Sequence, residues 1–324
     1  MTSVLVVAAG GVGPFVQMLG ALAALRIHHR NDHITLLTAA ETVEFAVASR
    51  LADDVWCDTT QGAWDFPWDF TALLNMRRRL REKNFAQVYD LDGGRAGKRL
   101  FRLMRDWGWS GARRAPASWC RDEPGTITSH RQAGHGAVHL VDRIAAQLLG
   151  AGIPEVPATD LTWVARQVTS FNVPFRMTEP FVLLACDPAI TGKDTQVAWP
   201  SERWTSLGAA VAAAGFIPIL VGLSPAPSLR EALAVSAPRT VDLTEHTTIS
   251  DLVFLAWAAK GAVGGDNGLM HLFAIAGCRS VVLYDATSDP ARNGQRGRDV
   301  AILRRATLAE IPAGEVMAAL RRRA

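Results

Sequence analysis

VLVVAAGGVGPF, residues 4–15, is an unbroken apolar run that leads into a glycine-rich turn. A strand without polar alternation is typical of a parallel sheet, in which helices cover both faces. Short runs of this kind alternate with helix-length segments along most of the chain, which indicates βα units. The sequence therefore predicts an α/β fold with mostly parallel sheets.

A proline-rich stretch near the middle separates two halves of similar size. Residues 151–180 carry four prolines, and the strand–helix rhythm restarts at Phe181. Prolines at this density are typical of connections between domains. We expect two Rossmann-like domains, over residues 1–160 and 161–324, that face each other across a cleft. The last helix would pack on its own domain or back on the N-terminal one, and the stretch 108–136 is expected to be a long loop.

The composition of the 324-residue chain excludes several classes of protein. Apolar residues make up 49% and charged residues 20%, which suffices for a large core and excludes a disordered chain. No apolar run reaches the ~18 residues of a membrane-spanning helix. The first residues show no signal-peptide pattern, and the four cysteines lie far apart. We therefore expect a cytoplasmic protein without a disulfide framework or a zinc site.

Basic residues are concentrated in one region of a chain whose net charge is only +3. Residues 70–121 hold 13 Lys and Arg against 4 Asp and Glu, a local balance of +9. Such a region suits an anionic partner, although a solvated helix surface has the same composition. It lacks the motifs of a nucleic-acid binder, so we expect no nucleic-acid partner. The terminal Arg321–Arg323 would add attraction to a membrane surface, or simply be solvated.

The first glycine-rich turn, residues 10–14, stands where a dinucleotide-binding loop would lie. The dinucleotide fingerprint is incomplete, because Val16 occupies the position of its third glycine and no acidic residue ends the second strand, 34–38. Pro14 also removes one amide donor from the first turn of the helix. These features argue against an NAD site.

A second glycine-rich turn, GGDNG at residues 264–268, follows a buried strand and begins a short helix. Asn267 is a good N-cap, and the amides at a helix N-terminus attract phosphate. His271 lies one turn further on the same face, where its ring could donate to the same anion. The alternative is structural: the glycines form a tight turn, Asp266 caps it, and His271 is a core histidine.

Segments around this turn form a recognisable pattern, GDNGLMH at 265–271, GCRSVVLY at 277–284 and SDP at 288–290. Weaker matches are PFVQMLGAL at 14–22, VYDLDG at 88–93 and WPSERW at 199–204. Together they resemble the family 9 glycosyltransferases, the heptosyltransferases of lipopolysaccharide core assembly. The resemblance implies a GT-B fold, and inverting, metal-independent transfer of a sugar, typically heptose from ADP-heptose.

The resemblance also assigns roles to the two domains. The C-terminal domain would hold the nucleotide sugar, with no cofactor besides this donor substrate, and the acceptor would lie against the N-terminal domain. The implied donor contacts are Asp266, Asn267, Gly268 and His271 for the diphosphate and sugar, and Thr247 and Thr248 for the nucleoside. An anionic glycolipid or glycan acceptor would agree with the basic region and with a place at the cytoplasmic face of the inner membrane.

Two positions depart from the family pattern. Pro14 stands where the family usually has an aspartate that acts as the general base, and Val197 where it has a lysine that pairs with the donor phosphates. Inverting transfer needs a base for the acceptor hydroxyl and positive charge for the leaving diphosphate. Asp90 and Asp92, at the end of the strand 88–91, are candidate catalytic bases; the alternative is that they cap the glycine turn after them.

Positive charge for the diphosphate could come from the loop after Cys186. Lys193 would supply the charge, or be an ordinary exposed lysine, and Thr191 and Gly192 would contact a phosphate through a hydroxyl and an amide. Two functions remain open at this point. One is an active glycosyltransferase, and the other is a catalytically silent relative that keeps the fold and nucleotide-sugar binding.

Overall fold

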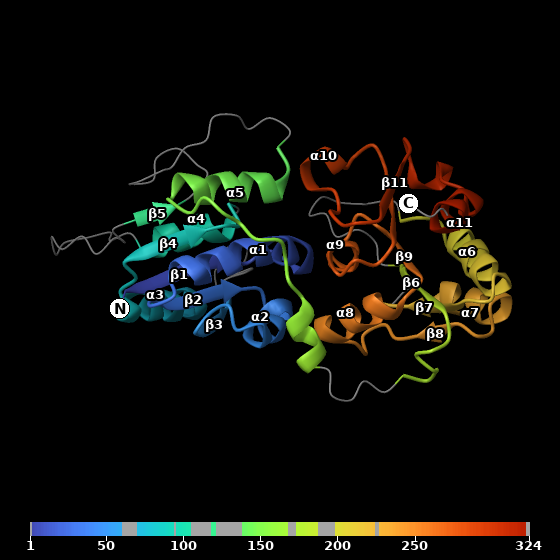
Figure 1. Cartoon of the computed structure of the whole chain (residues 1–324), viewed down its shortest axis with the longest axis horizontal. Helices are drawn as coiled ribbons and strands as arrows, with labels where there is room; N and C mark the ends of the chain where they lie inside the picture. Colours follow the sequence, from blue (N-terminus) through green and yellow to red (C-terminus); the bar gives the residue numbers. More distant parts are fainter. Residues whose placement is uncertain are drawn as a thin grey trace. The chain divides into compact units, whose positions relative to one another are not determined.

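A computed structural model of the chain describes residues 2–59, 70–93, 95–104, 118–120, 138–167, 173–186, 198–223 and 227–321. The chain divides into two compact units, Met1–Asp160 (unit 1) and Leu161–Ala324 (unit 2). Each unit consists of a parallel β-sheet with helices on both faces (Figure 1). None of the helices in these ranges is long and apolar enough to cross a membrane.

Unit 1 contains five strands in the order β3-β2-β1-β4-β5, all paired in parallel. The strands are β1 (Ser3–Ala8), β2 (His33–Thr38), β3 (Asp54–Cys57), β4 (Gln87–Asp90) and β5 (Ser118–Cys120). Strand β5 corrects the expectation of a loop throughout 108–136. Three residues at a sheet edge are too few to produce a readable pattern of apolar positions.

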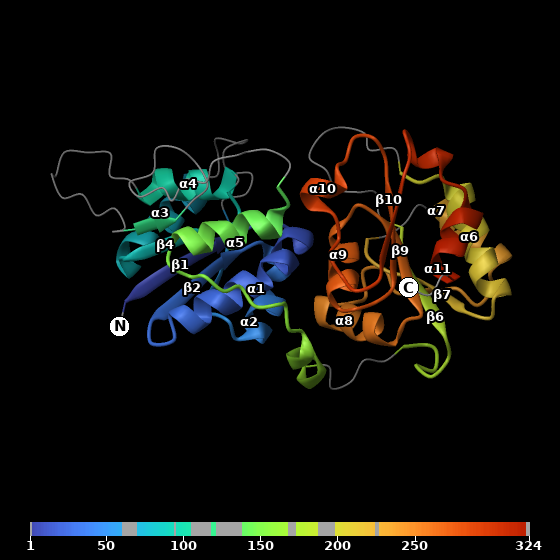
Figure 2. The ribbon, with the colours of Figure 1, turned by 45° about the horizontal axis from the view of Figure 1, so that its top comes forward.

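The helices of unit 1 are α1 (Val12–His28), η1 (Ala40–Thr42), α2 (Val43–Ser49), α3 (Phe70–Lys83), α4 (Arg95–Met104) and α5 (Leu140–Gly150). Figure 2 shows α1, α2 and α5 on one face of the sheet and α3 and α4 on the other. On the second face, Leu5 and Val7 of β1 share a core with Leu80 of α3 and Leu100 of α4. The apolar face of the sheet and the apolar faces of α3 and α4 are thus buried against each other.

Unit 2 contains six strands in the order β11-β10-β9-β6-β7-β8, again all parallel. The strands are β6 (Phe181–Ala185), β7 (Ile217–Leu220), β8 (Val241–Asp242), β9 (Gly261–Gly265), β10 (Ser280–Tyr284) and β11 (Val300–Arg304). The helices are η2 (Thr162–Arg166), α6 (Ser201–Ala213), α7 (Pro227–Ser236), α8 (Ile249–Ala258), α9 (Gly268–Ile275), α10 (Pro290–Asn293), η3 (Leu308–Glu310) and α11 (Ala313–Arg321).

Helices α6, α7 and α11 cover one face of this sheet, and α8 and α9 cover the other (Figure 1). The last helix, α11, packs on α6 and β10 of its own unit, because Val316 and Met317 join the core there. The apolar face of α11 is therefore buried within unit 2. The helix does not need to pack back on the first domain, which was the other arrangement that the sequence allowed. Trp199 and Trp204 form an edge-to-face pair in the same core, with ring centroids 4.8 Å apart.

Both sheets have the doubly wound strand order of a Rossmann-like domain. The order reverses between β1 and β4 in unit 1, and between β6 and β9 in unit 2. Ligands of such sheets bind beyond the carboxyl ends of the strands, at this switch point. The turns after β1, β4, β6 and β9 are therefore the places to look for a site.

Candidate functional site

The turn between β9 and α9 lies at the switch point of unit 2. Asn267 is the N-cap of α9, and its Oδ1 accepts a hydrogen bond from the Met270 amide at 3.1 Å. A β-carbon on Gly265 would meet no atom within 4 Å, so the backbone there borders open space. A helix N-terminus carries partial positive charge, and open space beside it gives room for an anion.

The side chain of Asn267 provides a second sign of a ligand. Its residue is 8% exposed, and Nδ2 has no hydrogen-bond partner among the residues that the structure describes. A buried donor left without a partner costs about 1–3 kcal/mol. An acceptor oxygen delivered to this turn would remove that cost.

Asp266 points its carboxylate into a hydrogen-bond network. Oδ1 accepts from the Tyr284 hydroxyl at 2.9 Å and from Gln295 Nε2 at 3.1 Å, and Oδ2 accepts from the Ser288 hydroxyl. Burial, with Asp266 next in importance, raises the pKa of Tyr284 above its ordinary value, so the phenol stays protonated. Asp266 thus holds the loop after β10 against the α9 turn. His271, 3% exposed, approaches the same network through Gln295.

The two threonines expected near the nucleoside stand at the start of α8. Thr248 is the N-cap and forms a capping box with Asp251, in which each side chain accepts a hydrogen bond from the other residue's backbone amide. Thr247 is half-buried beside it. Helices α8 and α9 pack together, and both begin at the carboxyl edge of the sheet. The structure thus brings these threonines to the same edge as Asn267.

The remaining donor-side candidates, Thr191, Gly192 and Lys193, lie outside the described residues, as does Val197. They follow β6, the strand beside β9 at the switch point. Within the ranges that the structure covers, no group of three or more His, Cys, Asp or Glu side chains could hold a metal ion.

In unit 1 the two candidate bases have different surroundings. Asp90 is fully buried, accepts a hydrogen bond from the Gly93 amide at 3.1 Å, and lies so close to α4 that a β-carbon on Gly97 would stand 1.8 Å from its Oδ2. Its carboxylate therefore closes the turn, as the structural alternative predicted. Asp92 is half-buried, and its Oδ1 lies 3.1 Å from where a β-carbon on Gly10 would stand. It is the more accessible of the two carboxylates.

A carboxylate of the protein itself occupies the first turn of α1. Glu41 Oε1 accepts a hydrogen bond from the Val12 amide at 3.1 Å, at the helix N-terminus where a phosphate would bind in a dinucleotide fold. Pro14, two residues further, has no amide hydrogen to offer. A bound phosphate would displace the Glu41 carboxylate, which agrees with the expectation of no NAD site.

Several charges of the basic region are matched by neighbours. Arg78 pairs with Glu82 at 2.7 Å, Lys83 with Asp54 at 2.9 Å, and Arg99 with Asp58 at 3.2 Å. Arg79 stacks on the Trp56 ring, 4.0 Å from its centroid. These contacts offset part of the positive charge of α3, which holds four arginines and one lysine against one glutamate.

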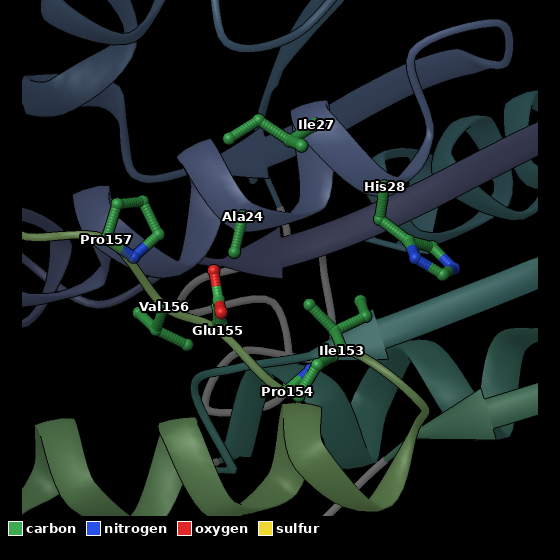
Figure 3. Close-up of a pocket in the computed structure, with 8 residues that line it drawn as sticks. All are labelled: Ala24, Ile27, His28, Ile153, Pro154, Glu155, Val156 and Pro157. Carbon is green, nitrogen blue, oxygen red and sulfur yellow. The ribbon is translucent and has the colours of Figure 1, made fainter.

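A hollow of about 640 Å³ lies elsewhere in unit 1 (Figure 3). Ala24, Ile27 and His28 of α1 line it on one side, and the segment 153–157 on the other. Apart from His28 and Glu155 its walls are apolar. Among the described residues, none of the site residues expected from the sequence lines this hollow.

A sequence profile of glycosyltransferase family 9 (heptosyltransferase) matches residues 73–312. The chain belongs to glycosyltransferase family 9. This confirms the resemblance drawn from the pattern around the α9 turn, and it makes the protein a relative of glycosyltransferases. No curated protein sequence matches this family 9 chain significantly.

Solved structures agree on the fold. E. coli heptosyltransferase WaaC with ADP is 19% identical over 98% of both chains, with a TM-score of 0.73. A family 9 glycosyl transferase from Veillonella parvula is 15% identical, covering 98% of this chain and 95% of that one, with a TM-score of 0.75. E. coli ADP-heptose lps heptosyltransferase II is 17% identical, covering 99% and 97%, with a TM-score of 0.71. The expected GT-B class is thereby confirmed.

Two residues that contact these turns could not be predicted from the sequence. Glu41 reaches Val12 across 29 positions of the chain, and Gln295 reaches Asp266 across 29 as well. Neither contact follows a helical or strand period, and neither residue belongs to the segments that resemble the family. Only the folding of distant segments onto one turn places them there.

Proposed function

We propose that this protein is an active glycosyltransferase that transfers heptose from ADP-heptose, with inversion and without a metal, to a glycan acceptor of the lipopolysaccharide-core type. The observation that carries the proposal is the buried Asn267 Nδ2, which lacks a described partner at the N-terminus of α9. Structures of the related E. coli WaaC contain ADP or ADP-2-deoxy-2-fluoro heptose, which supports an ADP-sugar as the donor class.

The donor diphosphate would bind at the α9 turn. Asn267 Nδ2 and the first helix amides would donate to its oxygens, and Gly265 and Gly268 would let it approach the backbone. These donors would stabilise the negative charge that grows on the diphosphate as the bond to the sugar breaks. Lys193, on the segment after β6, would add a full positive charge.

The acceptor hydroxyl would lose its proton to Asp92. The oxygen would then form a bond to the anomeric carbon while the bond between that carbon and the diphosphate breaks, which inverts the configuration. Asp92 supports this role by its half-buried position next to Gly10 and Pro14. Asp90, fully buried against α4, remains the second candidate.

The acceptor is proposed to be anionic, because α3 carries four arginines and one lysine against a single glutamate. A phosphorylated glycolipid at the cytoplasmic face of the inner membrane would meet this charge. The proposal places the acceptor on unit 1 and the donor on unit 2, as the family resemblance implies.

Donor binding is tested by titrating ADP into the wild-type chain and an Asn267→Ser variant, with calorimetry for affinity and thermal melting for stability. Serine preserves the N-cap but lacks the amide donor. We expect ADP to raise the wild-type melting temperature by ligand linkage. We expect the variant to bind ADP at least about tenfold more weakly, because a hydrogen bond to a charged group is lost. Equal affinity in both proteins would remove Asn267 from the donor site.

The catalytically silent relative is the second candidate, and one observation favours it: Pro14 stands where the family usually carries its base. The discriminating measurement is turnover of ADP-heptose, followed as release of ADP with a heptose-deficient lipopolysaccharide core as acceptor. Donor binding with no ADP release above the level of an Asp92→Asn variant would favour the silent relative.

A further inference from the structure

Gln295 joins two residues of the proposed donor site behind the α9 turn. Its Nε2 lies 3.1 Å from Asp266 Oδ1 and 3.3 Å from His271 Nε2, and its Oε1 lies 2.7 Å from the Tyr284 hydroxyl. Gln295 is 5% exposed, His271 3% and Tyr284 1%. In such surroundings the hydrogens of each group are determined by its neighbours, because water does not compete.

The carboxylate of Asp266 decides which way the Gln295 amide faces. An ionised carboxylate accepts hydrogen bonds and cannot donate them, so the amide atom beside it must be the nitrogen. The reverse orientation would bring two acceptor oxygens together 3.1 Å apart. On the other side, the Tyr284 hydroxyl lies 2.7 Å from the amide oxygen and 2.9 Å from Asp266 Oδ1, so its single hydrogen is shared between these two acceptors.

The orientation of the amide in turn decides the tautomer of His271. One N–H of Gln295 serves Asp266, and the other N–H points at His271 Nε2. A nitrogen that accepts a hydrogen bond carries no proton, so the proton of the neutral ring must be on Nδ1. Asp266 thus acts on His271 through Gln295.

We propose that Gln295 is a positioning residue that fixes His271 as the neutral Nδ1–H tautomer. The role of this tautomer rests on the proposed function and on the donor contact that the family resemblance implies for His271, which would then donate from Nδ1 to the diphosphate or sugar. A ring with the opposite tautomer would present a lone pair to a phosphate oxygen and repel it. Gln295 acts before the donor arrives, because Asp266, His271 and Tyr284, which it contacts, all belong to unit 2.

The tautomer is measured directly by NMR of the full-length chain labelled with ¹⁵N-histidine. The two ring nitrogens have chemical shifts that separate the Nδ1–H form, the Nε2–H form and the imidazolium. The chain has eight histidines, and loss of one signal in a His271→Gln variant assigns the relevant ring. We expect the wild-type ring of His271 to be the Nδ1–H form at neutral pH. An Nε2–H form or an imidazolium would overturn the proposal.

Two substitutions test the part played by Gln295. In Gln295→Glu the oxygen that replaces Nε2 would share a proton with Asp266 and accept a hydrogen bond from His271 Nε2–H, so this variant should invert the tautomer. Methionine in Gln295→Met keeps the side-chain length but has no N–H donor, so the His271 ring should become a mixture of tautomers. This variant also tests the proposal if the glutamate variant does not fold. A Gln147→Met variant, which removes a buried amide in unit 1, should leave the His271 signals unchanged. Unchanged His271 signals in both Gln295 variants would overturn the proposal.

ADP affinity then separates this inference from the proposed function. If only a fraction of the ring has the competent tautomer, the apparent dissociation constant rises by the inverse of that fraction. We expect roughly two- to fivefold weaker binding in Gln295→Met and more than about tenfold in Gln295→Glu. Absence of ADP binding to the wild type, with the tautomer as expected, would refute the donor site and leave the positioning by Gln295 intact. Wild-type affinity in a variant whose tautomer has inverted would show that Nδ1–H does not serve the donor.

Discussion

The carboxylate of Asp92 lies against Gly10: its Oδ1 is 3.1 Å from the point that a β-carbon on Gly10 would occupy. The Pro14 ring borders the same point, at 2.8 Å. The family usually carries its base at the position of Pro14, so a carboxylate from the end of β4 stands next to the place where that base is missing. The switch point of the sheet, where β1 and β4 are neighbours, creates this proximity.

Asp92→Asn is expected to lower the turnover of ADP-heptose by ~10²–10⁴, because an amide cannot take the proton of the acceptor hydroxyl. ADP affinity should stay at the wild-type level, since the donor is assigned to unit 2. The measurement is initial-rate kinetics together with calorimetric titration of ADP. Asp90→Asn is the matched comparison and should affect melting temperature more than turnover, because Asp90 closes a buried turn. A reversed pattern, with turnover lost only in Asp90→Asn, would reassign the base.

Charge reversal on α3 is expected to weaken contact with an anionic acceptor. Replacing Arg77, Arg78 and Arg81 by Glu should reduce binding to vesicles that contain anionic lipid, and raising the salt concentration should reduce the wild-type binding as well. ADP binding should not change. Reversing three exposed arginines of unit 2, Arg166, Arg176 and Arg239, is the matched control for net charge. Equal loss of vesicle binding in both triple variants would mean that total charge, and not this face, matters.

Gly97→Ala is expected to destabilise unit 1. Its β-carbon would stand 1.8 Å from the Asp90 carboxylate, which cannot move freely because it is buried against α4. Overpacking of this kind costs typically about 1–3 kcal/mol of unfolding free energy. Gly314→Ala in α11 is the control: it adds a β-carbon in open space and should stabilise the helix by roughly 0.5–1 kcal/mol. Chemical denaturation measures the unfolding free energy of both variants. A Gly97→Ala variant as stable as the wild type would show that the turn at Asp90 can rearrange at little cost.

Asp32 is expected to make stability depend on pH at the acid end. Hydrogen bonds from Thr2 and then from His29 hold the pKa of this carboxyl well below its ordinary value of 3.8. A carboxyl whose folded pKa is depressed stabilises the fold above its unfolded pKa, and this contribution fades as the pH falls toward the folded pKa. Urea midpoints of the wild type and Asp32→Asn should therefore differ from pH 7 down to about pH 4 and approach each other progressively as the pH falls further. A constant difference over that range would contradict the assignment.

Much of the fold could be predicted because it depends on local patterns. The apolar run of β1 and the glycine turn after β9 have the same appearance in the sequence as in the structure, since burial on both faces of a parallel sheet needs continuous apolar residues. The three-residue strand β5 could not be predicted, because an edge strand this short has no period to read. The packing of α11 on α6 could not be predicted either, because the sequence of a helix does not show which apolar surface of the folded chain lies beside it.

The site divides in the same way. The N-cap at Asn267 and the capping box at Thr248 each join residues three positions apart, so both can be read from the sequence. The choice between Asp90 and Asp92 could not be made from the sequence, because Asp92 lies beyond the end of β4, where the alternation of a strand no longer determines the direction of a side chain. Only the packing of α4 against Asp90 showed that one carboxylate is enclosed and the other is half-buried.

The sequence by itself determined the α/β class, the two halves, the family and the turn before α9, because these depend on residues that are neighbours along the chain. The tertiary structure decided that Glu41 occupies the start of α1, that Asp92 borders Gly10, and that Gln295 links Asp266 to His271. Each of these contacts joins segments that meet only when the parallel strands align. Hydrogen bonds act over about 3 Å, so they depend on the folded positions of atoms rather than on the order of residues.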